Sequence, residues 1–475
     1  MKDFSTGALH EYQKHAVRFL TLRLEENRGA ALFIDCGLGK TLISLEYLHR
    51  QKRLLGGDFP PVFVFAPLPV VYNVWPREVK KFGYDFSPAI LHGDDKDMSL
   101  RERRHDLYLI NYEGLPWLSS QRHFPAGKCI FIFDESTRLK SGTGVRYRAL
   151  KRILPRAEKV ILLTGTPAPN SYIDLFSQVF LLDNGEALGT TLTSFRRNYC
   201  FQGGFQGRQW FFNTRLEPHL RAKIAPLVLR LDRRDHLSIP AVLYNHVEVE
   251  LPEQARSQYN EIEKSLFTLL DSGESLIADT ASAAYSMCRS IANGGCYRRD
   301  PVTGELLETI ALHTAKTDAA MSVIAELSGK SVLLVYQFKH DRERLERALS
   351  DTVGKNNFGF IGGGTKLSVS KWLIDRFNDA DLRVLAVQPQ AVSHGVNLQS
   401  ACCDVIWYGL PDSLETWLQT NSRVDRQGQL SDQVRIHIIS ASNTIDSMLR
   451  RRLIKKESRQ TTLLAALLEY QKSKK

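Results

Sequence analysis

Short continuous apolar runs alternate with polar, helix-like stretches from about residue 29 to residue 182. The runs are ALFI (31–34), VFVFAP (62–67), LYLINY (107–112), CIFIF (129–133) and VILLTG (160–165). Unbroken β-branched and aromatic runs are typical of parallel strands that helices cover on both faces. The stretches between the runs are long enough for crossover helices, so the pattern predicts a doubly wound α/β domain.

A second series of runs begins after residue 330. It consists of SVLLVYQF (331–338), FGFIGG (358–363), RVLAVQP (383–389), DVIWYGL (404–410) and VRIHII (434–439). Helical periodicity occurs between the runs, for example in residues 340–349 and 369–378. The chain is therefore predicted to hold two α/β domains.

The region between the two series, roughly 183–312, has a different character. Residues 252–270 show helical periodicity, and residues 293–305 (NGGCYRRDPVTGE) are typical of a turn or hairpin. The end of the chain is basic from Arg450 and then apolar over 461–470, which predicts a helix packed on one of the domains.

Length and composition agree with a globular protein of more than one domain. At 475 residues the chain is too long for one simple core. No apolar run is long enough to span a bilayer, and the first residues lack the apolar segment of a secretory signal. Seven cysteines without a C-x-x-C pair argue against a disulfide framework or a zinc site. We expect a reducing, intracellular location in the cytoplasm and no membrane partner.

A glycine-rich turn connects the first apolar run to a predicted helix. Gly37 and Gly39 would let backbone N–H groups close around phosphate oxygens, next to the positive end of the helix dipole. Lys40 would reach the β- and γ-phosphates of a nucleotide, and Thr41 would offer its hydroxyl to Mg²⁺. The general pattern has glycine where this chain has Ile34, so this motif alone leaves a chance match open.

Two adjacent carboxylates, Asp134 and Glu135, follow directly after the apolar run 129–133. The carboxyl ends of parallel strands are where open α/β sheets bind ligands. We expect Asp134 to hold the Mg²⁺ of a nucleotide bound at Lys40 and Thr41, and Glu135 to accept a proton from the water that attacks the γ-phosphate. A solvated charge pair is the alternative, but it does not account for the position at a strand end.

Taken in order, a set of motifs along nearly the whole chain resembles one protein family. The motifs are LHEYQ (9–13), DCGLGKT (35–41), FAPLPVVYNVWPREVKKF (65–82), LINYEGL (109–115), DESTRLKS (134–141), LTGTPAPN (163–170), VYQFKH (335–340), SHGVNLQ (393–399) and QTNSRVDRQGQ (419–429). They resemble superfamily-two helicase-like ATPases of the Snf (sucrose-non-fermenting) type, most of all the compact members found in phages and mobile elements.

The resemblance implies two RecA-like lobes with ATP in the cleft between them. The corresponding division is an N-terminal ATP-binding lobe (1–230), a helical linker or insertion (231–312), a C-terminal lobe (313–460) and a tail helix (461–475).

The resemblance also assigns roles in the first lobe. Gln13 matches the glutamine that recognises adenine. Thr164, Gly165 and Thr166 match the segment that couples the nucleotide site to the DNA-binding side. Asp35-Cys36 replaces the more usual Glu-Met before the glycine, a change that we expect to alter packing more than chemistry.

In the second lobe, the resemblance implies that Gly395 and Asn397 contact the nucleotide and the backbone, and that Arg423 and Arg426 are arginine fingers. Residues three or four apart on a helix share a face, so we expect Gln419, Arg423 and Arg426 to point the same way. A solvated basic stripe is the alternative. Trp417 and Leu418 indicate that the helix is packed, which favours the functional interpretation.

The function that the resemblance implies is a DNA-stimulated ATPase, with ATP and Mg²⁺ as cofactors, that translocates along double-stranded DNA. Two alternatives stay open: a helicase that separates strands of DNA or RNA, and an ATP-gated DNA-binding subunit of a larger assembly. Single-stranded DNA or RNA is therefore an alternative partner. The sequence does not indicate which proteins bind to this chain.

The formal net charge of +11 favours a polyanionic partner, because lysines and arginines near phosphates release condensed counterions. Candidate backbone contacts are Arg138, Lys140, Arg146, Arg148, Arg196, Arg197 and Lys366. Aromatic and basic residues mix over 195–212. Base stacking is one interpretation of this mixture, but we expect Trp210, Phe211 and Phe212 to form a packed cover over the first lobe.

Overall fold

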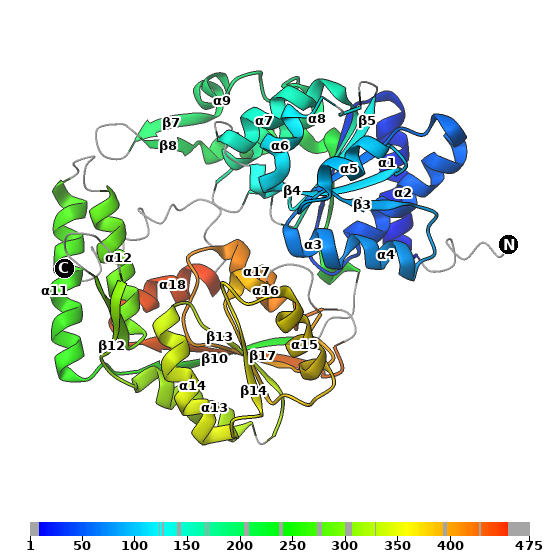
Figure 1. Cartoon of the computed structure of the whole chain (residues 1–475). Coiled ribbons are helices and arrows are strands. Elements are labelled where there is room, and N and C mark those ends of the chain that lie inside the picture. Colours follow the sequence, from blue (N-terminus) through cyan, green and yellow to red (C-terminus); the bar gives the residue numbers. More distant parts are fainter. Residues whose placement is uncertain are drawn as a thin grey trace. The chain divides into compact units, whose positions relative to one another are not determined.

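The computed structural model describes residues 9–454 except for 123, 126–127, 140–143, 166, 169–170, 204–208, 237–240, 273–277, 300–305, 328, 393–396 and 427–428. The chain divides into two compact units, Met1–Ser238 and Ile239–Lys475. Each unit has its own parallel sheet with helices on both faces (Figure 1). The predicted class, two α/β lobes with helix-flanked parallel sheets, is confirmed.

Unit 1 contains a seven-stranded sheet in the order β3-β4-β2-β5-β6-β1-β9, and all its strand pairs are parallel. The five predicted apolar runs form β1 (Gly29–Ile34), β2 (Val62–Ala66), β4 (Leu107–Asn111), β5 (Cys129–Asp134) and β6 (Ala157–Thr164). The short strands β3 (Pro88–Ile90) and β9 (Val228–Leu231), which the apolar pattern does not predict, extend the two edges of the sheet.

Side chains of the unit 1 strands alternate between two helical layers. In β2, Val62 and Val64 belong to one apolar core, whereas Phe63 and Phe65 belong to the other. The first core is completed by α1 (Glu11–Glu26), α2 (Lys40–Leu55), α3 (Leu68–Asn73) and α4 (Trp75–Lys81). The second core includes residues of α5 (Lys96–Glu102), α6 (Leu115–Ser120), α7 (Val145–Ile153), α8 (Asp174–Asp183), α9 (Leu192–Tyr199) and α10 (Glu217–Ile224).

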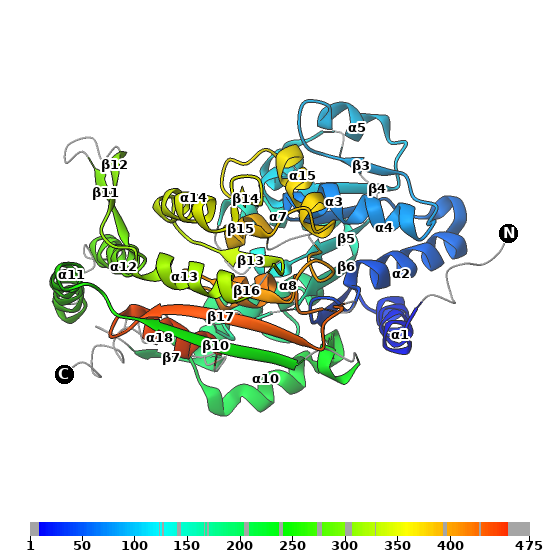
Figure 2. The same cartoon turned by 90° about the horizontal axis from the view of Figure 1, so that it is seen from below.

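Unit 2 contains a six-stranded parallel sheet in the order β10-β17-β16-β13-β15-β14. The five runs predicted after residue 330 form β13 (Val332–Val335), β14 (Phe358–Ile361), β15 (Val384–Val387), β16 (Asp404–Trp407) and β17 (Gln433–Ala441). Edge strand β10 (Ala241–Val249) lies along β17, as Figure 2 shows.

The helices of unit 2 also form two layers. Leu333 and Val335 of β13 share a core with α11 (Glu253–Ser272), α12 (Ala278–Ala292), α15 (Leu367–Asn378), α16 (Pro389–Val392), α17 (Leu414–Asn421) and α18 (Ile445–Ile454). Val332 and Leu334 face the other core, which includes α13 (Ala315–Glu326) and α14 (Lys339–Val353). Among the described residues, no helix is both long enough and apolar enough to cross a bilayer.

Residues 231–312, predicted as a linker or insertion, are divided between the two units. β9 ends at Leu231 in the sheet of unit 1, whereas β10, α11 and α12 belong to unit 2. The turn or hairpin predicted at 293–305 is confirmed, because β11 (Gly295–Arg299) pairs antiparallel with β12 (Leu306–Ala311). The predicted tail helix at 461–475 lies outside the described residues.

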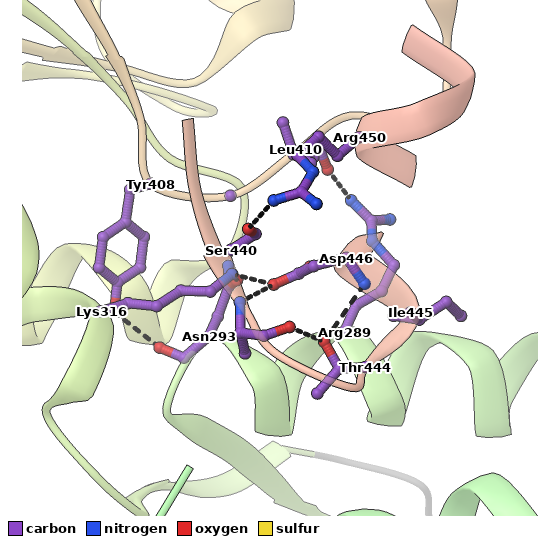
Figure 3. Close-up of polar contacts among 12 residues, drawn as sticks. Arg289, Asn293, Lys316, Tyr408, Leu410, Ser440, Thr444, Ile445, Asp446 and Arg450 are labelled. Carbon is purple, nitrogen blue, oxygen red and sulfur yellow. Dashed lines mark hydrogen bonds and ion pairs between the residues drawn. The ribbon is translucent and has the colours of Figure 1, made fainter. Parts of the chain in front are cut away.

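A buried polar network joins Asn293, the residue that follows α12, to α13 and to the start of α18 in unit 2 (Figure 3). The ammonium of Lys316, which is fully buried, lies 2.5 Å from Asp446 Oδ2 and donates to Asn293 Oδ1 at 2.8 Å. Asp446 also accepts the backbone N–H of Ala441 at 3.0 Å. Buried charges persist only when paired and hydrogen-bonded, so this network fixes α18 against α13.

Candidate functional site

The predicted nucleotide-binding segments of unit 1 follow β1, β5 and β6. These strands are parallel neighbours in the order β5-β6-β1, so their carboxyl ends lie at one edge of the sheet. The glycine loop, the pair Asp134 and Glu135, and the pair Thr164 and Gly165 therefore gather at that edge, where open α/β sheets bind ligands.

The glycine loop leads from β1 into α2, which begins at Lys40. Gly37 and Gly39 have φ values of 94° and 82°. Residues with a side chain adopt such positive φ values only with backbone strain, whereas glycine adopts them readily. Lys40 Nζ donates to the carbonyl oxygen of Ile34 at 2.8 Å, so the ammonium lies against the loop. The departure from glycine at Ile34 has a structural reason, because that side chain is buried in the core as the last residue of β1.

Gln13 touches the glycine loop directly. Its Nε2 donates to the carbonyl of Leu38 at 3.1 Å, and its Oε1 accepts the backbone N–H of His10 at 3.0 Å. A Cβ built on Gly39 would lie 2.6 Å from Gln13 Nε2, so only glycine fits beneath the amide. An amide has two N–H groups and two oxygen lone pairs, so each end keeps capacity for a nucleotide base.

Asp134 ends β5 and is buried. Burial raises the pKa of this carboxyl, while the Lys40 ammonium and the indole N–H of Trp75 oppose the rise. Trp75 Nε1 donates to Asp134 Oδ2 at 3.0 Å, and the hydroxyl of Tyr112 donates to the Asp134 carbonyl at 2.9 Å. The sequence reasoning missed Trp75 and Tyr112, although both lie in motifs that carry the resemblance.

Glu135 is also buried, and it adopts a φ of 57°. A left-handed conformation at a residue other than glycine costs on the order of 1–3 kcal/mol and is concentrated at functional sites. The following residues, Ser136–Leu139, form a 3₁₀ turn in which Arg138 N–H donates to the Glu135 carbonyl at 3.0 Å. This turn holds the second carboxylate at the same strand end as the first.

The residues at this edge fit a nucleotide with Mg²⁺. Lys40 and the N-terminus of α2 supply positive charge for phosphates. Thr41 and Asp134 supply oxygen ligands of the kind that Mg²⁺ prefers. A divalent cation would also stabilise the ionised form of Asp134, which burial alone disfavours.

A buried glutamine, Gln178 of α8, links the carboxylate segment to the predicted coupling segment. It accepts from Ser136 Oγ at 2.7 Å and donates to the carbonyl of Pro167 at 2.7 Å. Thr164 is buried at the end of β6, and a Cβ on Gly165 would lie 3.4 Å from the Ile34 carbonyl. Thr166 lies outside the described residues. Sequence reasoning missed Gln178, because no motif contains it.

The predicted arginine fingers of unit 2 do not lie on a helix. α17 ends at Asn421, and the N–H groups of Arg423 and Arg426 bond to the carbonyls of Thr420 and Val424, three and two residues back. The prediction that these arginines share one helix face with Gln419 is therefore wrong, because the chain turns before it reaches them.

The turn after α17 still brings predicted residues together. Arg426 Nη1 donates to Asn397 Oδ1. Arg423 is buried, and its Nε donates to the Gln419 carbonyl at 3.2 Å. The expected packing of α17 is confirmed, since Trp417 is buried with its ring 4.7 Å from that of another buried tryptophan. Gly395 lies outside the described residues.

The loop that precedes α17 is anchored from α12. Arg289 donates to Asp412 Oδ2 at 2.6 Å and to the carbonyl of Leu410 at 2.7 Å. Tyr285 OH also donates to Asp412. These contacts fix the start of α17, the helix that leads into the turn with Arg423 and Arg426. No sequence motif indicated them.

Candidate DNA contacts also interact with other residues of the protein. Arg146 pairs with Glu113 at 2.7 Å, and Arg196 lies 5.8 Å from the Trp210 ring centre. Lys140 lies outside the described residues, and the following are exposed: Arg138, Arg148, Arg197 and Lys366. DNA contact by any of them stays a prediction.

The aromatic residues of 195–212 lie on α9 and on the hairpin of β7 (Cys200–Gly203) and β8 (Gln209–Phe212). Phe212 is buried, 4.8 Å from the ring of Tyr172, which confirms the predicted packed cover for this residue. Trp210 and Phe211 are half-buried, and Phe211 stacks on the exposed Phe201 at 5.8 Å.

Comparison with known domain families agrees with this arrangement. Residues 12–293 match the SNF2-related domain, and residues 315–428 match the helicase conserved C-terminal domain. The chain belongs to the SNF2-related family. This SNF2-related protein is accordingly a helicase-like ATPase that uses ATP.

Relatives come from phages, bacteria and eukaryotes. Protein p41 of Acyrthosiphon pisum secondary endosymbiont phage 1 is 32% identical over 453 residues, which cover 91% of this chain and 93% of p41. YwqA of Bacillus subtilis (strain 168) is named for an inferred ATP-dependent helicase/translocase activity. It is 26% identical to this chain, and the alignment covers 96% of this chain and 48% of YwqA. The bovine DNA annealing helicase and endonuclease ZRANB3 is 24% identical over 94% of this chain and 40% of its own length. The chain thus spans nearly all of p41 but less than half of the other two.

Among solved structures, the Sulfolobus solfataricus SWI2/SNF2 ATPase core in complex with dsDNA covers 95% of this chain and 91% of that chain, at 21% identity and a TM-score of 0.44.

Proposed function

We propose that this SNF2-related ATPase hydrolyses ATP with Mg²⁺ in a DNA-stimulated cycle and translocates along double-stranded DNA. The observation that carries the proposal is the meeting of the Lys40 loop with the buried carboxylates Asp134 and Glu135 at one sheet edge. A solvated charge pair has no reason to be buried beside a glycine loop and fixed by an indole N–H.

In this proposal each group of unit 1 has one role. Gln13 reads the base, while Lys40 and the backbone N–H groups of the glycine loop bind the phosphates. Thr41 and Asp134 hold Mg²⁺, which neutralises negative charge that develops on the phosphates. Glu135 orients the attacking water and accepts its proton.

The second unit contributes positive charge. We assign Arg423 and Arg426 to the phosphates of the nucleotide, with Asn397 orienting Arg426 through the side-chain hydrogen bond between them. Arginine fingers accelerate phosphoryl transfer by roughly 10³–10⁵-fold in related systems.

We propose double-stranded DNA as the polymer along which the protein translocates. The net charge of +11 suits a phosphate backbone, and the relative ZRANB3 is named a DNA annealing helicase. Contacts to the backbone position a protein without reading sequence, which is what movement along DNA of any sequence requires.

The test is ATP turnover of the full chain without nucleic acid and with duplex DNA, single-stranded DNA, forked DNA or RNA. Duplex DNA should stimulate most, and displacement of a third strand from a triplex should accompany turnover. Lys40→Ala should abolish both activities. Separation of tailed duplexes would favour a helicase, and DNA binding with no turnover would favour an ATP-gated subunit.

A further inference from the structure

The last described segment of unit 1 is tied to the glycine loop. The N–H of Asp35 donates to the carbonyl of Leu231 at 3.1 Å, at the end of β9. In return, Asp35 Oδ2 accepts the N–H of Arg233 at 3.1 Å, at the start of the 3₁₀ turn Arg233–Asp235. Through this pair of bonds Asp35, which departs from the family pattern, holds residues 231–233 against the loop.

The same segment also contacts α1 through a stack of three rings. The Tyr12 ring stacks with the ring of His10 and with that of His236, with centroid distances of 5.4 Å and 5.1 Å and interplanar angles of 9° and 28°. His236 follows the 3₁₀ turn, and its N–H closes that turn on the Arg233 carbonyl at 3.2 Å. Tyr12 is buried, whereas both histidines are exposed.

Tyr12 contributes its ring and not its hydroxyl. The hydroxyl is buried and has no hydrogen-bond partner among the residues that the structure describes. A buried hydroxyl without a partner is unfavourable, so the ring must be what this position requires. The ring packs in the apolar core around α1 and stacks with His10 and with His236.

The stacked rings adjoin Gln13, the residue to which the proposed function assigns recognition of the base. Gln13 follows Tyr12 on α1, and its Oε1 accepts the N–H of His10, the residue whose ring also stacks with that of Tyr12. Its Nε2 reaches the Leu38 carbonyl in the glycine loop. The position of the Gln13 amide therefore depends on the stack at one end and on the loop at the other.

We propose that His236 is a positioning residue for nucleotide recognition, which acts through Tyr12 on Gln13. The inference rests on the proposed function, because it presumes that Gln13 reads the base. His236 belongs to neither the glycine loop nor the carboxylate pair. Its loss should therefore weaken ground-state binding and base discrimination without changing the chemical step.

The experiment is steady-state hydrolysis of ATP and GTP by the full chain at saturating duplex DNA. His236→Ala should raise KM for ATP about three- to tenfold, the range expected for loss of one aromatic contact. It should leave kcat within about twofold and lower the preference for ATP over GTP. His236→Phe keeps a ring in the stack and should restore KM.

Tyr12→Phe is the matched control. It removes only the unpartnered hydroxyl, so KM should stay at the wild-type value. Tyr12→Leu removes the ring and should reproduce the His236→Ala shift in KM, which provides a second test if His236→Ala fails to fold. An unchanged KM in both ring-deleting variants, or an equal fall in kcat for ATP and GTP with no change in KM, would overturn the inference.

Failure of this inference is distinguishable from failure of the proposed function. If Lys40→Ala abolishes turnover and His236→Ala leaves KM and the ATP preference intact, the ATPase assignment stands and His236 has no positioning role. If Lys40→Ala retains full turnover, the assignment of the glycine loop itself is wrong.

Discussion

Replacing Gly39 with alanine should damage the nucleotide site by a predictable amount. At φ 82°, an L-residue costs about 1–2 kcal/mol relative to glycine. The new Cβ would lie 2.6 Å from Gln13 Nε2 and so displaces the amide, which loses its hydrogen bond to Leu38. A lost hydrogen bond adds about 0.5–1.5 kcal/mol, so we expect roughly 1.5–3.5 kcal/mol in total.

Two variants separate the backbone strain from the collision. Gly83→Ala has a similar backbone strain, with φ of 65°, but no atom lies within 4 Å of its Cβ. It should cost only about 1–2 kcal/mol and leave nucleotide binding unchanged. In a Gln13→Ala background the collision is absent, so Gly39→Ala should then cost no more than Gly83→Ala.

The assays are urea denaturation of the full chain for the free energy of unfolding and titration with a non-hydrolysable ATP analogue for Kd. Gly39→Ala should weaken analogue binding more than tenfold, which corresponds to about 1.4 kcal/mol. If Gly39→Ala and Gly83→Ala have equal costs, or if the effects of Gly39→Ala and Gln13→Ala simply add, the amide is not held against the loop as the structure shows.

The remaining predictions concern buried charged groups. Glu135→Gln should bind ATP normally but hydrolyse it about 10²–10⁴-fold more slowly in single-turnover assays, because it cannot accept a proton; normal turnover would remove its role as base. Asp134→Asn should abolish Mg²⁺-dependent hydrolysis yet raise stability near pH 7–8. Burial raises the folded-state pKa of Asp134 above its unfolded value, so its ionisation destabilises the fold as pH rises through that folded pKa. The stability gain should therefore vanish in urea melts below about pH 4; a gain that is constant with pH would contradict this. Lys316→Met should cost about 3–5 kcal/mol in the unfolding of unit 2, since Asp446 is left buried without its cation, and a loss under about 1 kcal/mol would show that the pair is not needed.

The strands and the glycine loop could be predicted from the sequence because both are local signals. A strand buried on both faces must be apolar along its whole length, so the ten predicted runs became the ten strands β1, β2, β4, β5, β6 and β13–β17. The pattern of apolar runs did not predict the edge strands β3, β9 and β10. β3 and β9 are short, and β10 is largely exposed along its length, so none of the three forms a long apolar run. Gly37 and Gly39 were predictable for a similar reason, since a tight loop around phosphates restricts the residue type at each position.

The error at the arginine turn shows the limit of local reasoning. Spacing of three and four residues predicts one helix face for Gln419, Arg423 and Arg426, but spacing does not say where a helix ends. Here the helix ends at Asn421, whose Oδ1 accepts the indole N–H of Trp407 at 2.9 Å. Arg426 is instead placed by Asn397.

By itself, the sequence determined that two parallel α/β units would form, and that a phosphate-binding loop and a carboxylate pair would each follow a buried strand. Only the tertiary structure decided which distant groups position these segments. The indole N–H of Trp75 donates to Asp134, 59 residues away, and the backbone N–H of Arg233 donates to Asp35, 198 residues away. Periodicity and motif spacing report neighbours along the chain. Contacts across such separations depend on the order in which strands join a sheet and on the packing of the helices between them.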